Sequence, residues 1–101
     1  MEKITVEKTS QELIKAAKLR VRKTKEDALD DDIKQLVEAA LCDLRRIGVS
    51  DKYLTGCTDP LLREAVLTYV NANYGSNPNY EKLISSYNMH LIKITGGNYR
   101  E

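Results

Sequence analysis

Residues 30–48 read DDDIKQLVEAALCDLRRIG, and this stretch decides the fold class. Its apolar side chains recur at i, i+3, i+4, i+7, i+8, i+11 and i+14, which is one stripe of an α-helix. The acids at its start and Arg45 and Arg46 in its last turn complement the helix dipole, and Gly48 supplies a stop. The spacing therefore predicts an amphipathic helix over about 30–47, with its apolar face on Ile33, Leu36, Val37, Ala40, Leu41, Leu44 and Ile47.

A second helix is predicted after the loop-like stretch 49–59, because Asp59 is a good N-cap and Pro60 suits the first helical position. The segment LLREAVLTYVNANY at 61–74 is apolar over more than half of its circumference and leaves a narrow polar stripe. A small domain does not easily cover so wide a face. We therefore expect this helix to be central and part of it to meet another subunit.

Two further helices flank this pair. Thr9 and Glu12 fit a capping box before a helix over about 10–20, and Asn77–Pro78 precede a helix that Gly96 and Gly97 end. The start, 1–8, alternates like a short strand and reads as an arm, and 95–101 reads as a polar tail. We expect one all-α domain over 1–101: a bundle of about four helices with a long loop between the second and third and flexible termini. The second and third should form an antiparallel pair with the fourth packed across them.

Composition narrows the function classes. A chain of 101 residues is the size of one domain, and 16 Lys plus Arg against 15 Asp plus Glu give a net charge of +1, with no global attraction to nucleic acid or anionic lipid. The start has no apolar signal-peptide core, and no window is apolar enough to span a bilayer. Cys42 and Cys57 are not spaced as metal ligands. We expect a soluble protein with reduced thiols, no membrane and no metal.

Catalytic motifs are missing from the sequence. The acidic run DALDDD at 27–32 lacks the alternate oxygen ligands and the sixth-position glycine of a calcium loop, so capping and solvation explain it better. His90 has no nucleophile placed beside it by a known signature, and neither a phosphate-binding glycine loop nor a GxSxG elbow is present. We expect no enzyme activity, no catalytic residues and no cofactor.

A basic run is the one feature with electrostatic reach. Six cations and no acid lie between positions 15 and 25: Lys15, Lys18, Arg20, Arg22, Lys23 and Lys25. They are candidate DNA-facing residues, and repetition around a ring would multiply their effect. An exposed face balanced by the acids that follow is the plainer alternative. A helix-turn-helix is disfavoured, because some eleven residues rather than three or four separate the second and third helices.

All six aromatic residues are tyrosines, which combine apolar area with a polar tip and suit surfaces that are partly buried and partly wet. Core packing and a subunit contact both remain open for them. The candidate subunit interface comprises residues of the third and fourth predicted helices: Leu67, Val70, Tyr74, Tyr80 and Tyr87.

Three blocks together, DDDIKQLVEAALCDLRRIGV, DPLLREAVLTYVNANYG and NYEKLISSY, resemble the small head-tail connector proteins of long-tailed phages and prophages, often described as putative DNA-packaging proteins. The resemblance covers roughly Glu12 to Leu91. It rests on helix order, spacing and a few apolar and turn positions.

The resemblance implies a structural role without catalysis. Such connectors assemble as a ring beneath the portal, join the capsid to tail-side stopper proteins, and let double-stranded DNA pass without tight binding. They act in the host cytoplasm during assembly and then in the virion neck. The family's portal contact would fall here on the end of the fourth helix and the tail, with Ile92, Ile94, Asn98 and Tyr99 as candidates. The alternative function is a small helical DNA-binding regulator that uses the basic run 15–25.

Overall fold

The computed structural model describes residues 11–22, 30–55, 57–75 and 77–100, and within these ranges every regular element is a helix. The all-α class is thus confirmed, with one helix more than expected. The predicted arm at 1–8, and Thr9 of the capping box, lie outside the described residues. The helices are α1 (Gln11–Arg22), α2 (Asp30–Arg46), α3 (Asp51–Leu54), α4 (Pro60–Asn73) and α5 (Tyr80–Thr95).

Helix α2 ends as its sequence predicts. The Val49 N–H donates to the Leu44 carbonyl and the Gly48 N–H to the Arg45 carbonyl, both at 3.0 Å, which is the pair of bonds of a Schellman motif. Gly48 has a φ of 108°, a conformation that a side chain would strain. Val49 and Leu44 are both buried, which adds the apolar contact typical of this motif.

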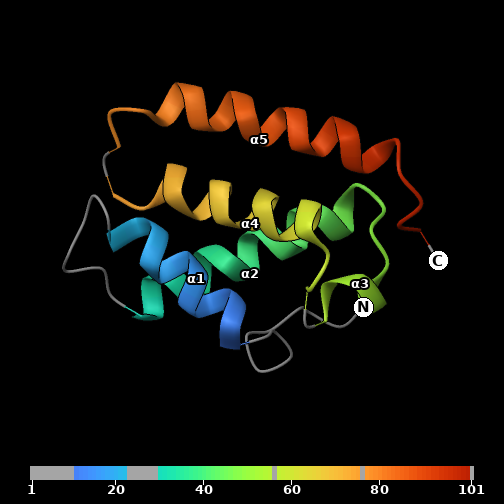
Figure 1. Ribbon diagram of the computed structural model, residues 1–101, viewed down its shortest axis with the longest axis horizontal. Helices are drawn as coiled ribbons and strands as arrows, with labels where there is room; N and C mark the ends of the chain where they lie inside the picture. Colours follow the sequence, from blue (N-terminus) through green and yellow to red (C-terminus); the bar gives the residue numbers. More distant parts are fainter. Residues whose placement is uncertain (1–10, 23–29, 56, 76, 101) are drawn as a thin grey trace.

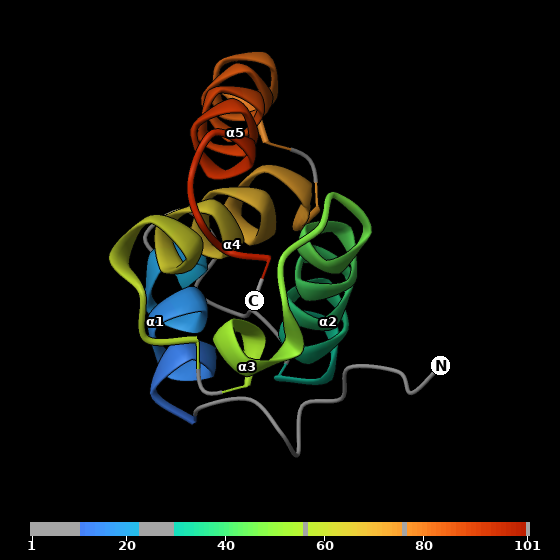
Figure 2. The same ribbon diagram turned by 90° about the vertical axis from the view of Figure 1, so that its right-hand side faces the viewer.

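Helix α4 is the centre of the fold, as its wide apolar face predicts. It contacts α1, α2 and α5, and Figures 1 and 2 show it between α5 on one side and α1 and α2 on the other. The Asp59 side chain caps it by accepting from the backbone N–H groups of Leu61 at 2.9 Å and Leu62 at 3.2 Å. The apolar face of α4 is covered within one copy of the chain.

The predicted loop at 49–59 contains a short helix that the sequence analysis missed. Helix α3 is a single turn, too short to show periodicity, and its Leu54 side chain is fully buried in the core. Cys57 follows in the left-handed region with φ 47° and is buried as well. The connection between α2 and α4 is thus anchored by apolar side chains.

Helix α5 packs chiefly along α4, whereas the sequence predicted that it would lie across both partners of the central pair. It reaches α2 through one long side chain, Tyr87, whose hydroxyl donates to the Asp43 carboxylate at 2.8 Å. The Tyr87 ring also lies 5.2 Å from the Tyr69 ring on α4. Burial raises the pKa of Tyr87 to about 12, so its hydroxyl remains a donor at neutral pH.

The tail after α5 turns back onto α3 and the start of α4, where the sequence predicted a flexible end. The Ser50 N–H donates to the Tyr99 carbonyl at 2.7 Å, and the Tyr99 hydroxyl donates to the Asp59 carboxylate at 3.1 Å. The Tyr99 and Tyr53 rings meet edge to face at 5.3 Å. Asp59 therefore caps α4 and holds the tail with the same carboxylate.

Candidate interaction surfaces

The described part of the chain carries surface grooves rather than an enclosed reaction site. The largest hollow has a volume of about 540 Å³ and opens to solvent between α2 and the end of α4. No three His, Cys, Asp or Glu side chains converge as metal ligands within the described ranges. No helix there is long and apolar enough to cross a bilayer. The surfaces to consider are therefore those that could meet another macromolecule.

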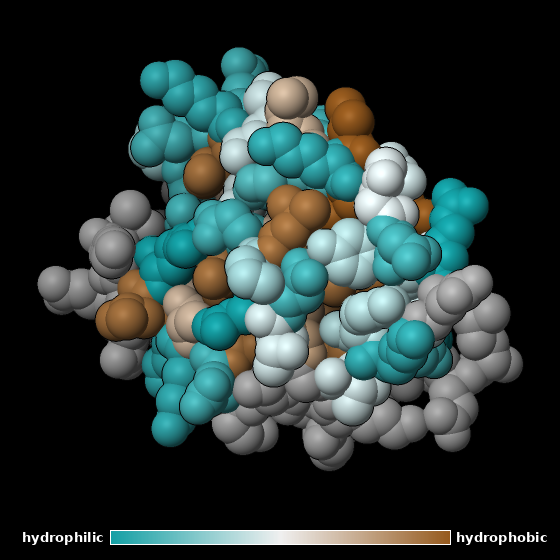
Figure 3. All heavy atoms as spheres, turned by 45° about the vertical axis from the view of Figure 1, so that its right-hand side comes forward, coloured by the Kyte–Doolittle hydropathy of each residue, from teal (hydrophilic) through white to brown (hydrophobic). Residues whose placement is uncertain are grey.

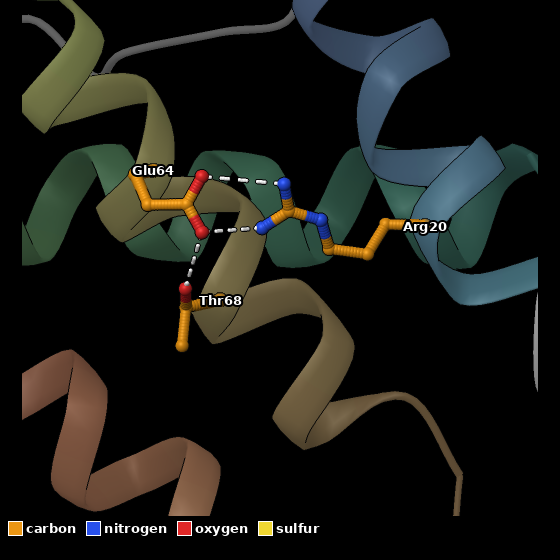
Figure 4. A network of polar contacts seen from close by, with 3 residues as sticks. All are labelled: Arg20, Glu64 and Thr68. Atoms are coloured by element: carbon orange, nitrogen blue, oxygen red, sulfur yellow. Dashed lines mark hydrogen bonds and ion pairs between the residues drawn. The ribbon is translucent and has the colours of Figure 1, made fainter.

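On α1 the basic run divides between exposed and engaged side chains. Lys15 is exposed and Lys18 is half-buried, but the Arg20 guanidinium forms a two-pronged ion pair with Glu64 of α4, at 2.6 and 3.2 Å (Figure 4). Arg20 therefore serves to join α1 to α4. The side chains of Arg22, Lys23 and Lys25 lie outside the described residues, so their DNA-facing role stays a prediction.

The ion pair sets the electrostatics of Glu64. The hydrogen bond from Arg20 is the main reason that the pKa of Glu64 lies below its ordinary value, and a weaker bond from the Thr68 hydroxyl at 3.3 Å acts in the same direction. A positive charge on His90 would lower this pKa further. The group links α1, α4 and α5 and holds no catalytic arrangement, because the guanidinium occupies both carboxylate oxygens.

The candidate subunit interface falls largely inside the monomer. Leu67, Val70 and Tyr87 are buried, Tyr74 is half-buried, and Tyr80 is 46% exposed. Buried side chains are covered by the chain's own helices, so a contact between folded copies requires the exposed ones. Of this set, Tyr80 meets that condition fully.

The candidate portal contact is similarly divided. Ile92 is 65% exposed and Asn98 is exposed, whereas Ile94 is 2% exposed and Tyr99 is held by Asp59 and Ser50. Ile94 and Tyr99 anchor the end of α5 and the tail to the rest of the domain. Ile92 and Asn98 are the two that face solvent.

Two exposed apolar side chains were missed by the sequence analysis. Leu19 on α1 is 66% exposed and Met89 on α5 is 56% exposed. Each falls outside the apolar stripe of its helix, and that position was the available signal. Figure 3 shows the apolar side chains of one face scattered in small groups among polar ones, rather than gathered in a single patch. Such dispersed contacts suit association that is weak until several copies combine.

The groove between α2 and α4 was also missed. It is lined by residues of the outer face of α2 and of the end of α4: Asp32, Gln35, Leu36, Ala39, Asn73, Tyr74 and Gly75. A second hollow of about 270 Å³ shares Gln35 and Ala39 and adds Glu38 and Cys42. We name the two together the α2 groove. The small Ala39 side chain leaves this space open, and the acids make its edge negative.

Two polar atoms are buried without a partner among the described residues: Asn71 Oδ1 and His90 Nδ1. Both lie on half-buried side chains, Asn71 on α4 and His90 on α5. His90 had been expected to be structural or at the surface, and its half-buried position is compatible with either. No other titratable group donates to or accepts from its ring within the described ranges, so it does not form part of a proton-transfer pair.

Comparisons of the chain with models of protein families, with curated proteins and with solved structures found no match in any of the three.

Proposed function

We propose that this protein is a structural head-tail connector of a tailed phage or prophage. It assembles as a ring beneath the portal, joins the capsid to tail-side stopper proteins, and leaves a passage that double-stranded DNA crosses without tight binding. It works in the host cytoplasm during assembly and then in the virion neck. The ordered series of amphipathic helices from 11 to 95, with the acid-rich start of α2, supports the resemblance on which the proposal rests.

The single observation that carries the proposal is the set of large apolar side chains exposed on separate helices of a domain whose core is already closed. Leu19 lies on α1, whereas Tyr80, Met89 and Ile92 lie on α5. Exposed apolar residues rimmed by polar ones are typical of protein–protein contact sites. A ring subunit needs at least two such sites, one for each neighbour, in addition to the surface that meets the portal.

The test has a solution part and an assembly part. Sedimentation velocity over a wide concentration range should show a monomer or a concentration-dependent oligomer, because ring closure in such systems depends on the portal as template. Adding portal rings encoded beside this gene should then give a complex whose added mass corresponds to a full ring of copies. A tight dimer at every concentration, or no binding to the portal, would contradict the proposal.

The alternative function, a small helical DNA-binding regulator, predicts a different result. Its binding to duplex DNA would be tight at low salt and would fall steeply as salt is raised, because each neutralised phosphate releases counterions. The connector should show only weak retention. Fluorescence anisotropy with labelled duplex DNA between 50 and 300 mM salt, roughly the range over which such binding weakens by orders of magnitude, separates the two.

A further inference from the structure

Two surfaces of this protein are complementary to one another but cannot meet within one copy. The first, which we name the α1 face, consists of Lys15, Lys18 and Leu19. The second is the α2 groove. Figure 2 shows α1 and α2 on opposite flanks of the molecule, below α4. A contact between the two surfaces therefore joins different copies.

The α1 face points directly away from the core. The buried side chains of α1 are Leu13, Ile14, Ala17 and Val21, and at about 100° per residue Leu19 falls on the opposite side of the helix. Leu19 is the most exposed large apolar side chain in the described ranges, and Lys15 lies one turn before it on the same face. The face thus presents an apolar knob beside positive charge.

The α2 groove offers the reverse. Its floor is formed by the half-buried Leu36 and Tyr74 and by the exposed Ala39, whose small side chain leaves room for a knob. Asp32 lines one part of the groove and Glu38 the other. One cation, Lys34, lies half-buried on α2, and it is not among the residues that line the groove.

We infer that Leu19 of one copy docks into the α2 groove of the next copy, with Lys15 and Lys18 facing Asp32 and Glu38. This inference rests on the proposed function and names the surfaces through which the connector assembles. The two surfaces differ and lie on opposite flanks, so the contact is head-to-tail and repeats from copy to copy. Head-to-tail contacts generate a ring when the rotation closes, and opposite charges set the register of neighbouring copies.

Two variants, each blocking one surface, test the inference. Leu19→Glu places a negative charge on the knob, and Ala39→Arg fills the groove. Both sites are exposed and both new residues are good helix formers, so the fold is retained, which circular dichroism checks. Each variant alone should remain monomeric at concentrations at which the wild type associates. Mixed together they should form a 1:1 heterodimer, because each still carries one intact surface. Sedimentation velocity measures all three.

Met89→Glu is the matched control, because Met89 is also exposed and apolar but lies on α5. It should associate as the wild type does. Association of Leu19→Glu at the wild-type level would overturn the docking but leave the ring proposal standing. A wild type that stays monomeric at every concentration and on the portal would overturn both.

Zero-length carbodiimide cross-linking of a mixture of ¹⁴N- and ¹⁵N-labelled copies provides a second readout for weak association. Cross-linked peptides that join Lys15 or Lys18 of one isotope to Asp32 or Glu38 of the other are expected. Their yield should fall severalfold when salt is raised from 50 to 500 mM, because the Debye length shortens from roughly 14 to about 4 Å. Cross-links confined to single copies would contradict the docking.

Discussion

Helices α4 and α5 are similar in length and both carry long apolar side chains, yet the fold treats them differently. Seven residues of α4 are buried, whereas α5 buries two, Tyr87 and Ile94. The difference follows from their neighbours, because α4 contacts three other helices and α5 lies mainly against α4. Burial of apolar area stabilises α4, while α5 depends on a few anchors. The outer helix is therefore the one with surface to spare for a partner.

The largest expected effect lies in the inner region. Leu62→Ala, at a fully buried position of α4, should lower the free energy of unfolding by about 2–5 kcal/mol, because it removes buried methyl groups and leaves a cavity. Leu91→Ala on α5, at a half-buried position, should cost less than half as much. Urea unfolding followed by circular dichroism measures both. Equal losses would remove the distinction between the two helices.

The next effect concerns the carboxylate that serves both regions. Asp59→Ala should lower the free energy of unfolding by about 1–2 kcal/mol, because α4 loses its N-cap and Tyr99 loses its acceptor. Tyr99→Phe removes the tail contact alone and should cost less. Thermal unfolding measures the stability, and hydrogen exchange at the Ser50 amide, which donates to the Tyr99 carbonyl, reports release of the tail. An Asp59→Ala variant as stable as the wild type would contradict this arrangement.

A smaller effect is expected where α5 reaches α2. Tyr87→Phe retains the ring but loses the hydroxyl that donates to Asp43, and it should lower the free energy of unfolding by about 0.5–1.5 kcal/mol. Hydrogen exchange should quicken along α5 more than along α4, because the anchor belongs to the outer helix. Tyr80→Phe is the matched control at an exposed position of α5 and should change neither quantity. Uniform quickening across both helices would show that they unfold together.

The smallest effect depends on pH. The pKa of Glu64 is lowered from its ordinary value of 4.5, so its carboxylate stabilises the fold above that pH and loses this contribution as the pH falls through the lowered pKa. Because both partners of the ion pair are partly exposed, Glu64→Gln should cost under about 1 kcal/mol at pH 7. The gap between wild type and variant should close as the pH is lowered below 4.5, as acid-dependent urea titrations would show.

The pH effect has an internal control. In an Arg20→Gln background, Glu64→Gln should have little further effect, because the hydrogen bond from Arg20 is the main cause of the lowered pKa. A pH dependence that survives in that background would assign the effect to Thr68 or His90 instead.

Elements with strong local signals were predicted well. The stripe at 33–47 and Gly48 located α2 and its end, and Asp59 with Pro60 located the start of α4, because capping and amphipathic spacing are local properties. Helix α3 was missed because four residues are too few to establish a period. The docked tail was missed because its partners, Asp59 and Ser50, lie about forty or more positions away along the chain.

The candidate surfaces were harder to predict than the helices. A basic run indicates charge, but only the fold shows that Arg20 is engaged by Glu64, 44 positions further on. The apolar face of α4 correctly indicated a central helix, yet it could not distinguish a partner subunit from α1, α2 and α5 as the cover. Side chains that lie off the apolar stripes, such as Leu19 and Ala39, were the signal for the surface that the sequence analysis passed over.

The sequence by itself determined that this protein is helical, where its long helices lie, and which of them carries too much apolar surface to stand at the edge. These properties depend on residues three or four positions apart. The tertiary structure alone decided which side chains remain exposed, which cations are paired, and that the α1 face and the α2 groove lie on opposite flanks. Such properties depend on contacts between helices, and helical spacing within one segment carries no information about them.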